Sequence, residues 1–373
     1  MSRTLFPHYS SQYQILHKIG QGGISEVYVA RCLSNDQLCA IKIINMEENK
    51  IDFQRFRRGV SIWSTSQHPN LIQYYCSFTV NSSLWIVSEY MDGGSCSDII
   101  DFSFQNGFKD EILLATIIKK TLKFLEYFHS NHQIHRNVQP SNILISHLGE
   151  VKIGNLYESA GLLQEGHRKA ARFSSISSTC YSSPEILNGR EGHTELSDIW
   201  SLGITAISLA MGRNPLHYKS DLELVREICK GKAPSLPSDM FSKSFHDFVE
   251  KCLTIDPAHR PSASELLKHK FLKKAKGKEY IKTILMNQIL PLDRRFEIMN
   301  GNQKVPDLRA SAPLPGIPKK EKKIKFDFCQ DFDSNKKAKE PFTPVVEDVQ
   351  VVQHGRFTCT LRKFSNIPQY LTI

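Results

Sequence analysis

The sequence lacks several features that would place it in other classes of protein. Its nine cysteines form no CxxC pair and no cluster with histidines, which argues against a zinc site and a disulfide framework. No window approaches the run of about 18 apolar residues that a membrane-spanning helix needs. The first residues, MSRTLFPHYSSQYQ, contain no apolar core of signal-peptide length. We therefore expect a soluble protein of the cytoplasm, with the nucleus as a second compartment, and no metal site.

Acidic residues are fewer than basic ones, and the formal net charge is +10. Such an excess can indicate contact with nucleic acid or with a membrane. The basic residues are scattered, however, and the densest run, KKEKKIK from Lys319, lies in a stretch rich in proline and lysine. That composition is typical of a flexible linker, although a docking peptide or a nuclear-import patch would look similar. We expect neither nucleic acid nor a membrane as a partner.

The chain has 373 residues, which is long for one ordinary domain and fits two lobes followed by a tail. Short apolar runs separated by glycine-rich and Asn-Asp breaks predict a β-rich N-lobe over about 13–91. Long apolar helical patterns predict a mostly helical C-lobe over about 92–272. We assign 273–373 to a tail that is mostly linker-like. Its last part, VVQHGRFTCTLRKF, could form a short strand or a peptide that binds a partner.

Short motifs follow one another in a fixed order between residues 13 and 272. Taken singly, each has an ordinary explanation, since a G-x-G pair can make a tight hairpin and a strand lysine can lie on a solvated face. The order is more informative than any single motif. The motifs are IGQGGISEV from Ile19, CAIK ending at Lys42, HPN at His68, SEYMDGGS, HRNVQPSNIL from His135, VKIGNLY, Ser183-Pro184-Glu185, SDIWSLG with Asp198, and HRPSASELLKHKF with Arg260.

In this order the motifs resemble a protein kinase, which implies an α+β fold of two lobes. The stretches LIQYYCSFTVNSSLWIVSEYMDGGSCSDII and HKFLKKAKGKEYI are similar to the oxidative-stress-responsive branch of the Sterile-twenty group. Two others, HRNVQPSNILIS and SDIWSLGITAISLAMG, also resemble the Sterile-twenty-related adaptor pseudokinases. The resemblance covers roughly the first 280 residues.

The resemblance to the adaptor class implies nucleotide binding, a closed shape and activation of a partner protein kinase. Adaptors of this class often end in a Trp-Glu-Phe peptide that docks on a helical-repeat scaffold protein. This chain ends in QYLTI, so the scaffold is only a second candidate partner. The resemblance further implies that ATP, without tightly bound Mg²⁺, contacts Ile19, Gly20, Gly22, Val27, Ala40, Lys42, Glu89, Met91 and Asn142. The alternative is a pocket that is empty or plugged.

Three positions depart from the active-kinase pattern in the loops of the C-lobe. Asn137 stands where an aspartate would accept the proton of the substrate hydroxyl, and an amide takes no proton near neutral pH. Asn155 replaces the aspartate that binds Mg²⁺, a cation that prefers charged oxygen ligands. Gln139 replaces a lysine that approaches the transferring phosphate. The resemblance therefore implies that the set of catalytic residues is not intact.

A further departure concerns the helix that follows the third strand. Counting back from HPN places Gly59 where a glutamate would pair with Lys42, and Asp52 could substitute only if the helix register has shifted. Tyr157 replaces the glycine that gives the metal-binding turn its freedom, so we expect another backbone path there. In contrast, Glu185 with Arg260 and Asp198 match residues whose role is structural, which indicates that the fold is kept.

Two hypotheses of different classes follow. The first is a pseudokinase adaptor that allosterically activates a partner protein kinase. The second is a residual Ser/Thr kinase that uses Lys42 and Asn142, and a regulatory module with an empty pocket is a third possibility. The stretch RFSSISSTCYSS, between Leu156 and Ser183, could be phosphorylated and pair with Arg136, or it could be a polar loop.

Overall fold

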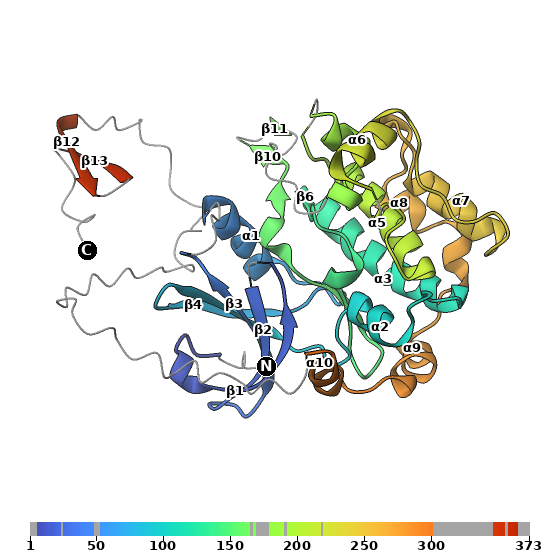
Figure 1. Ribbon diagram of the computed structural model, residues 1–373, viewed down its shortest axis with the longest axis horizontal. Coiled ribbons are helices and arrows are strands. Elements are labelled where there is room, and N and C mark those ends of the chain that lie inside the picture. The colour runs from blue at the N-terminus through green and yellow to red at the C-terminus, as the bar shows by residue number, and fades with distance from the viewer. Residues whose placement is uncertain are drawn as a thin grey trace. The chain divides into compact units, whose positions relative to one another are not determined.

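The computed structural model describes residues 6–23, 25–47, 53–164, 167–168, 179–189, 192–217, 219–300, 346–354 and 357–364. Two compact units divide the chain, Met1–Glu321 and Lys322–Ile373. The first unit has a small β-rich lobe and a larger helical lobe, which confirms the predicted α+β fold with two lobes (Figure 1). Among its described helices, none is both long and apolar enough to cross a membrane.

The N-lobe is a five-stranded sheet in the order β1-β2-β3-β5-β4. All neighbouring strands pair antiparallel. Short turns join β1 to β2, β2 to β3 and β4 to β5, whereas β3 pairs with β5 although helix α1 and β4 lie between them in the chain. Apolar side chains alternate toward a core on each face of the sheet. The elements are β1 (Tyr13–Gln21), β2 (Ser25–Cys32), β3 (Leu38–Asn45), α1 (Phe53–Thr65), β4 (Tyr74–Val80) and β5 (Ser83–Glu89).

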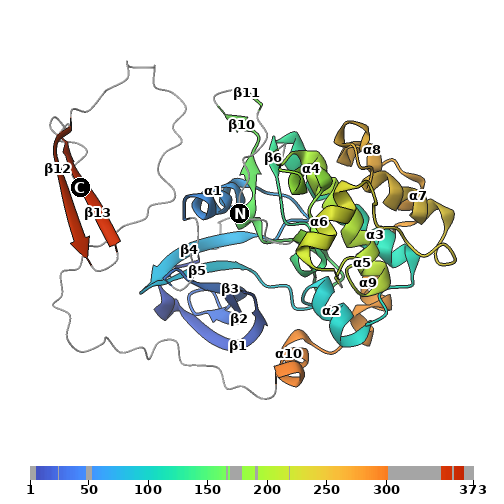
Figure 2. The same cartoon turned by 45° about the horizontal axis from the view of Figure 1, so that its top comes forward.

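The C-lobe is built around two long apolar helices, α3 (Glu111–Ser130) and α5 (Glu195–Met211). Asp110 caps α3 by accepting hydrogen bonds from two backbone N–H groups of its first turn. Smaller helices come before, between and after this pair in the chain (Figure 2). They are α2 (Cys96–Ser103), α4 (Pro184–Leu187), α6 (Asp221–Cys229), α7 (Lys243–Cys252), α8 (Ala263–Leu266), α9 (Lys278–Ile284) and α10 (Leu292–Asn300).

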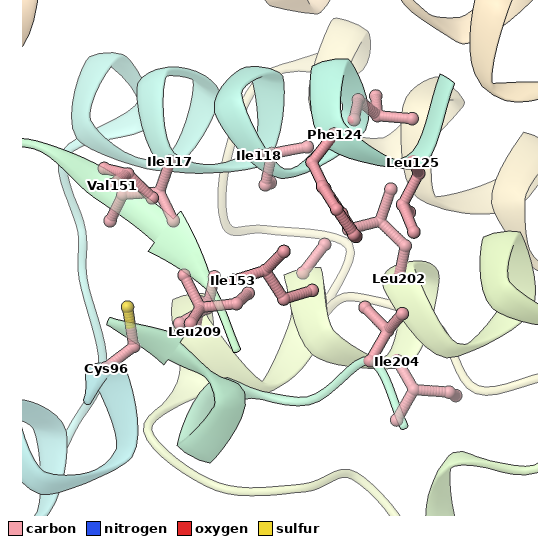
Figure 3. Packing of buried hydrophobic residues seen from close by; sticks show 14 of the residues in the cluster. Cys96, Ile117, Ile118, Phe124, Leu125, Val151, Ile153, Leu202, Ile204 and Leu209 are labelled. Atoms are coloured by element: carbon pink, nitrogen blue, oxygen red, sulfur yellow. The ribbon is translucent and has the colours of Figure 1, made fainter. Parts of the chain in front are cut away.

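Apolar residues of α3, α5 and β8 (Val151–Ile153) interdigitate in the centre of the C-lobe (Figure 3). Figure 3 shows Ile117 and Phe124 of α3 on one side of this core and Leu202 of α5 on another. Strand β8 pairs with β7 (Ile143–Ile145) and carries the loop that follows it into position. The loops before β7 and after β8 are therefore held by this strand pair, which positions the side chains of the candidate site.

The C-terminal part differs from the prediction in two ways. The folded region does not stop at residue 272, because α9 and α10 continue it to Asn300 with buried Ile281, Met286 and Leu292. In the second unit, β12 (Val346–His354) and β13 (Phe357–Phe364) pair antiparallel as a hairpin. The stretch VVQHGRFTCTLRKF, for which we expected a short strand or a peptide that binds a partner, covers the end of β12 and all of β13. The basic run from Lys319 lies outside the described residues.

Candidate nucleotide site

A cavity of about 740 Å³ lies between the glycine-rich turn of β1 and β2, the hinge after β5 and the loops of the C-lobe. Its volume falls in the range of about 300–1,000 Å³ that is typical of small-molecule sites. The structure brings all nine predicted nucleotide residues to this cavity. They are Ile19, Gly20, Gly22, Val27, Ala40, Lys42, Glu89, Met91 and Asn142.

Four of the five departing positions line the same cavity, namely Asn137, Gln139, Asn155 and Tyr157. The Nε2 of Gln139 donates to the Oδ1 of Asn137 at 2.7 Å, so this side-chain oxygen already has a donor. The Nδ2 of Asn142 donates to the backbone oxygen of Asn137 at 2.7 Å. The loop thus keeps an ordered shape through amide contacts, but it presents no group that can remove a proton from a hydroxyl.

Lys42 is held by neutral partners. Its Nζ donates to the Oδ1 of Asn155 at 2.9 Å and lies 4.4 Å from the centre of the Tyr157 ring. Asn155 adopts the left-handed conformation, with φ of 72°, which asparagine tolerates better than most residues. A cation above a tyrosine ring is stabilised by the ring quadrupole. A hydrogen-bonded amide and an aromatic ring therefore surround this lysine where a kinase would offer two carboxylates.

Gly59 is buried in α1 against the backbone of the short helix Leu156–Glu158. A Cβ atom at Gly59 would lie 2.2 Å from the carbonyl oxygen of Tyr157, so no larger residue fits without movement. The rings of Phe56 and Tyr157 stack beside this contact, with centroids 5.1 Å apart. The glycine thus lets the helix approach the loop that carries Tyr157. The alternative partner Asp52 lies outside the described residues.

Glu89 lines the cavity, but its carboxylate is engaged elsewhere. Its Oε1 accepts from the Nζ of Lys152 at 2.5 Å, and its Oε2 accepts from the backbone N–H of Gln73 at 3.0 Å. Only the backbone of Glu89 is therefore left to face a ligand. This arrangement holds the end of β5 against β8, so the side chain has a structural role that the motif did not indicate.

Asp198 orders the loop that contains Asn137. Its carboxylate accepts from the backbone N–H groups of His135 and Arg136, both at 2.8 Å, and it contacts the Nε2 of His129 at 2.9 Å. Burial alone would raise the pKa of Asp198, but these partners together hold the pKa below its usual value. The carboxylate is therefore charged at neutral pH and fixes the backbone, as its predicted structural role requires.

His135 is buried and neutral at pH 7, because burial lowers the pKa of its imidazole below 6.5. Its Nε2 lies 3.1 Å from the backbone oxygen of Gly154, and its Nδ1 accepts from the N–H of Asn137 at 3.2 Å. These partners fit the tautomer with the proton on Nε2. The imidazole thus joins the loop of Asn137 to the loop of Asn155.

The neutral state of His135 makes stability depend on pH. Below pH 6.5 the imidazole of His135 becomes protonated in the unfolded chain but stays neutral in the folded chain. The free energy of unfolding should therefore fall as the pH decreases through this range. Urea unfolding measured between pH 7.5 and 5 should show this slope. His135→Asn removes the titrating group and should flatten the slope, whereas equal slopes in both proteins would contradict the assignment.

Sequence reasoning missed several residues of the cavity wall, among them Ser95, Asp98 and Leu292. Ser95 and Asp98 line it from the start of α2, where they form a reciprocal cap of the helix. Leu292 lines it from α10, beyond the residues that the motifs cover. The S-x-x-D pattern could have indicated the cap, whereas nothing in the local sequence points from Leu292 to this cavity. Among the described residues, no three His, Cys, Asp or Glu side chains gather where they could hold a metal ion.

Comparison with known proteins places these features in a family. The model of the protein kinase domain matches residues 13–272. Serine/threonine-protein kinase fray2 of Dictyostelium discoideum is 36% identical over 302 residues, which cover 80% of this chain and 29% of that protein. Germinal center kinase 3 of Caenorhabditis elegans is 34% identical over 303 residues, which cover 76% of this chain and 51% of that protein.

Serine/threonine-protein kinase dst1 of Dictyostelium discoideum is 34% identical over 276 residues, which cover 74% of this chain and 36% of that protein. The chain thus spans about half or less of the length of these curated relatives. The shared region includes the sheet, the hinge and the loops that form the cavity. The chain therefore belongs to the protein kinase family, with a kinase domain of the Sterile-twenty type.

Proposed function

We propose that this chain is a catalytically impaired kinase domain that binds an adenine nucleotide and acts on a partner protein kinase. The observation that carries the proposal is the hydrogen bond from Lys42 to Asn155 beneath the ring of Tyr157. The amide at the metal position is already engaged by the strand lysine. A single neutral oxygen is also a poor ligand for Mg²⁺, which favours charged oxygens.

An adenine nucleotide fits the cavity in size and in chemistry. Ile19, Val27 and Ala40 supply apolar walls, and Lys42 supplies a cation for the phosphates. The amide oxygens of Asn155 and Asn142 carry no charge, so they are weaker ligands for Mg²⁺ than a carboxylate is. We therefore propose that ATP is a structural ligand, bound without tightly held metal.

Transfer of phosphate from such a ligand would be slow. Losing a general base costs roughly 10²–10⁴ in rate, and Asn137 cannot act as one. Gln139 brings no charge toward the phosphates, and Gly59 offers no carboxylate to Lys42. These losses affect one catalytic unit, so they do not add, but any of them lowers turnover strongly.

The retained residues support a role that depends on the fold. The buried contacts of Asp198 and the pair of Glu185 with Arg260 stabilise the kinase shape without taking part in phosphate transfer. A kinase shape that carries a nucleotide and lacks catalytic carboxylates is suited to binding a partner kinase and favouring its active state. The helical-repeat scaffold is the second proposed partner.

A residual Ser/Thr kinase is the alternative function. It is supported by the relatives fray2 and dst1, which are named as serine/threonine-protein kinases. It would use Lys42 to hold the phosphates, together with Asn142, the loop residue that matches the kinase motif. The two functions make opposite predictions for phosphate transfer.

Phosphate transfer from labelled ATP should be the same for the unaltered chain and for Lys42→Ala, with either Mg²⁺ or Mn²⁺ present. We expect both proteins to stay at background, because the amide of Asn137 cannot act as a base and the side chain of Asn155 accepts a hydrogen bond from Lys42. The assay should measure labelling of the chain itself and of a basic protein substrate. Transfer by the unaltered chain that disappears in Lys42→Ala would establish the residual kinase instead.

The adaptor role has a separate readout. The activity of a purified partner kinase should change several-fold when this chain is added, and Lys42→Ala should have the same effect if its fold is intact. A partner that responds only to the unaltered chain, in step with phosphate transfer, would contradict the adaptor role.

A further inference from the structure

Helix α10 lies beyond the matched kinase domain, yet it supplies part of the cavity wall. Leu292, its first residue, lines the cavity and is 5% exposed. It belongs to a buried apolar cluster with Ile19 of β1 and Val29 of β2. Tyr90 of the hinge borders the same cluster. Both views place α10 between the β-rich lobe and the helical lobe (Figure 1, Figure 2).

Arg295 anchors α10 to the hinge region. Its side chain is buried, with 1% of the residue exposed. Its Nε donates to the backbone oxygen of Leu290 at 3.0 Å, and its Nη2 donates to the backbone oxygen of Gly93. Two of the three guanidinium nitrogens are thus hydrogen-bonded to backbone oxygens, and Nη1 is buried without a partner among the described residues. Because burying a guanidinium without such bonds is costly, the two contacts favour this docked position of the helix.

The hinge is shaped to accept the docked helix. A Cβ atom at Gly94, whose φ is +77°, would lie 2.8 Å from the Cδ1 of Leu292 and 3.3 Å from the Nη2 of Arg295. A Cβ atom at Gly93 would lie 2.4 Å from the Cε of Met286, in the segment that leads to α10. The two glycines of the MDGGS stretch thus permit the C-terminal segment to approach the cavity.

We propose that docking of α10 and binding of an adenine nucleotide reinforce each other, with Leu292 contacting the nucleoside part of the ligand. This inference rests on the proposed nucleotide site. The cavity keeps about 740 Å³ with α10 docked, so the helix borders the space without filling it. A ligand that touches Leu292 binds the docked state more tightly, and by linkage it stabilises docking by the same factor.

Nucleotide affinity in matched variants tests the contact. ATP binding to the full chain, measured by calorimetry in the presence of EDTA, should weaken about tenfold in Leu292→Asp and in Arg295→Gln, within the usual range of coupling factors. The controls are Ile298→Asp, at a residue of α10 that is 62% exposed, and Arg294→Gln, whose side chain is 67% exposed. Both controls should bind ATP like the unaltered chain.

Hydrogen exchange tests the same coupling without any substitution. Backbone amides of α10 in the unaltered chain should exchange about tenfold more slowly when ATP saturates the site, whereas amides of α7, in the far part of the C-lobe, should not change. Equal ATP binding in all variants, or exchange of α10 that ATP leaves unchanged or makes faster, would overturn this inference alone. Absence of ATP binding to the unaltered chain would overturn the proposed nucleotide site and this inference with it.

Discussion

Replacing Glu185 by alanine should lower the free energy of unfolding by about 3–5 kcal/mol, because it leaves the buried charge of Arg260 without its carboxylate partner. Arg260 holds Glu185 through two hydrogen bonds, at 2.8 and 3.0 Å, and the two side chains are 0% and 5% exposed. The pair joins α4 to the loop before α8. Urea unfolding monitored by tryptophan fluorescence measures the loss.

An exposed ion pair serves as the control for this prediction. Arg294 and Glu297 lie 3.0 Å apart, with side chains that are 67% and 39% exposed. Glu297→Ala should therefore change the free energy of unfolding by less than about 1 kcal/mol. If Glu185→Ala cost no more than Glu297→Ala, the structural role of the buried pair would be wrong.

Gly59→Ala should destabilise the chain by about 2–3 kcal/mol, although the same exchange in an exposed helix stabilises by about 1 kcal/mol. The sign reverses because the new methyl group would meet the carbonyl oxygen of Tyr157, at 2.2 Å before any relaxation. Helix α1 must then move away from the loop that carries Asn155 and Tyr157, whose ring lies against Lys42. Urea unfolding and ATP affinity should both report the change.

Two further variants separate this contact from general effects on α1. Ser61→Ala, at an exposed position of the same helix, should change stability by less than about 0.5 kcal/mol. Gly59→Glu restores the residue type of an active kinase, but we expect it to destabilise at least as much as Gly59→Ala and to leave phosphate transfer at background. A stable Gly59→Glu protein that transfers phosphate would show that the missing carboxylate, and not the altered loop, is the defect.

The nucleotide residues could be predicted because each sits at a fixed distance from a strand end or a turn. Lys42 follows the alternation of β3, and the spacing from His135 to Asn142 is set by one loop. Such local patterns depend on backbone geometry that neighbouring residues determine. They were sufficient for the two lobes, for nine residues of the cavity wall and for the absence of carboxylates at Asn137 and Asn155.

Contacts between distant residues needed the tertiary structure. Tyr157 could be recognised as a substitution, but not as the ring that covers Lys42, since the bond that joins Lys42 to Asn155 spans 113 positions. The sequence likewise placed Gly59 at the helix position without explaining why only glycine fits there. That reason is a backbone contact that exists only once the helix has packed.

The sequence by itself determined the kinase fold of this protein and the asparagines at positions 137 and 155, because short motifs with regular spacing carry both. Only the tertiary structure decided which side chains these asparagines contact and how far the folded region extends. Arg295 reaches Gly93 across 202 positions, and Leu292 completes a cavity whose other walls lie far earlier in the chain. Packing of that kind depends on the shapes of whole elements, which no local pattern of residues encodes.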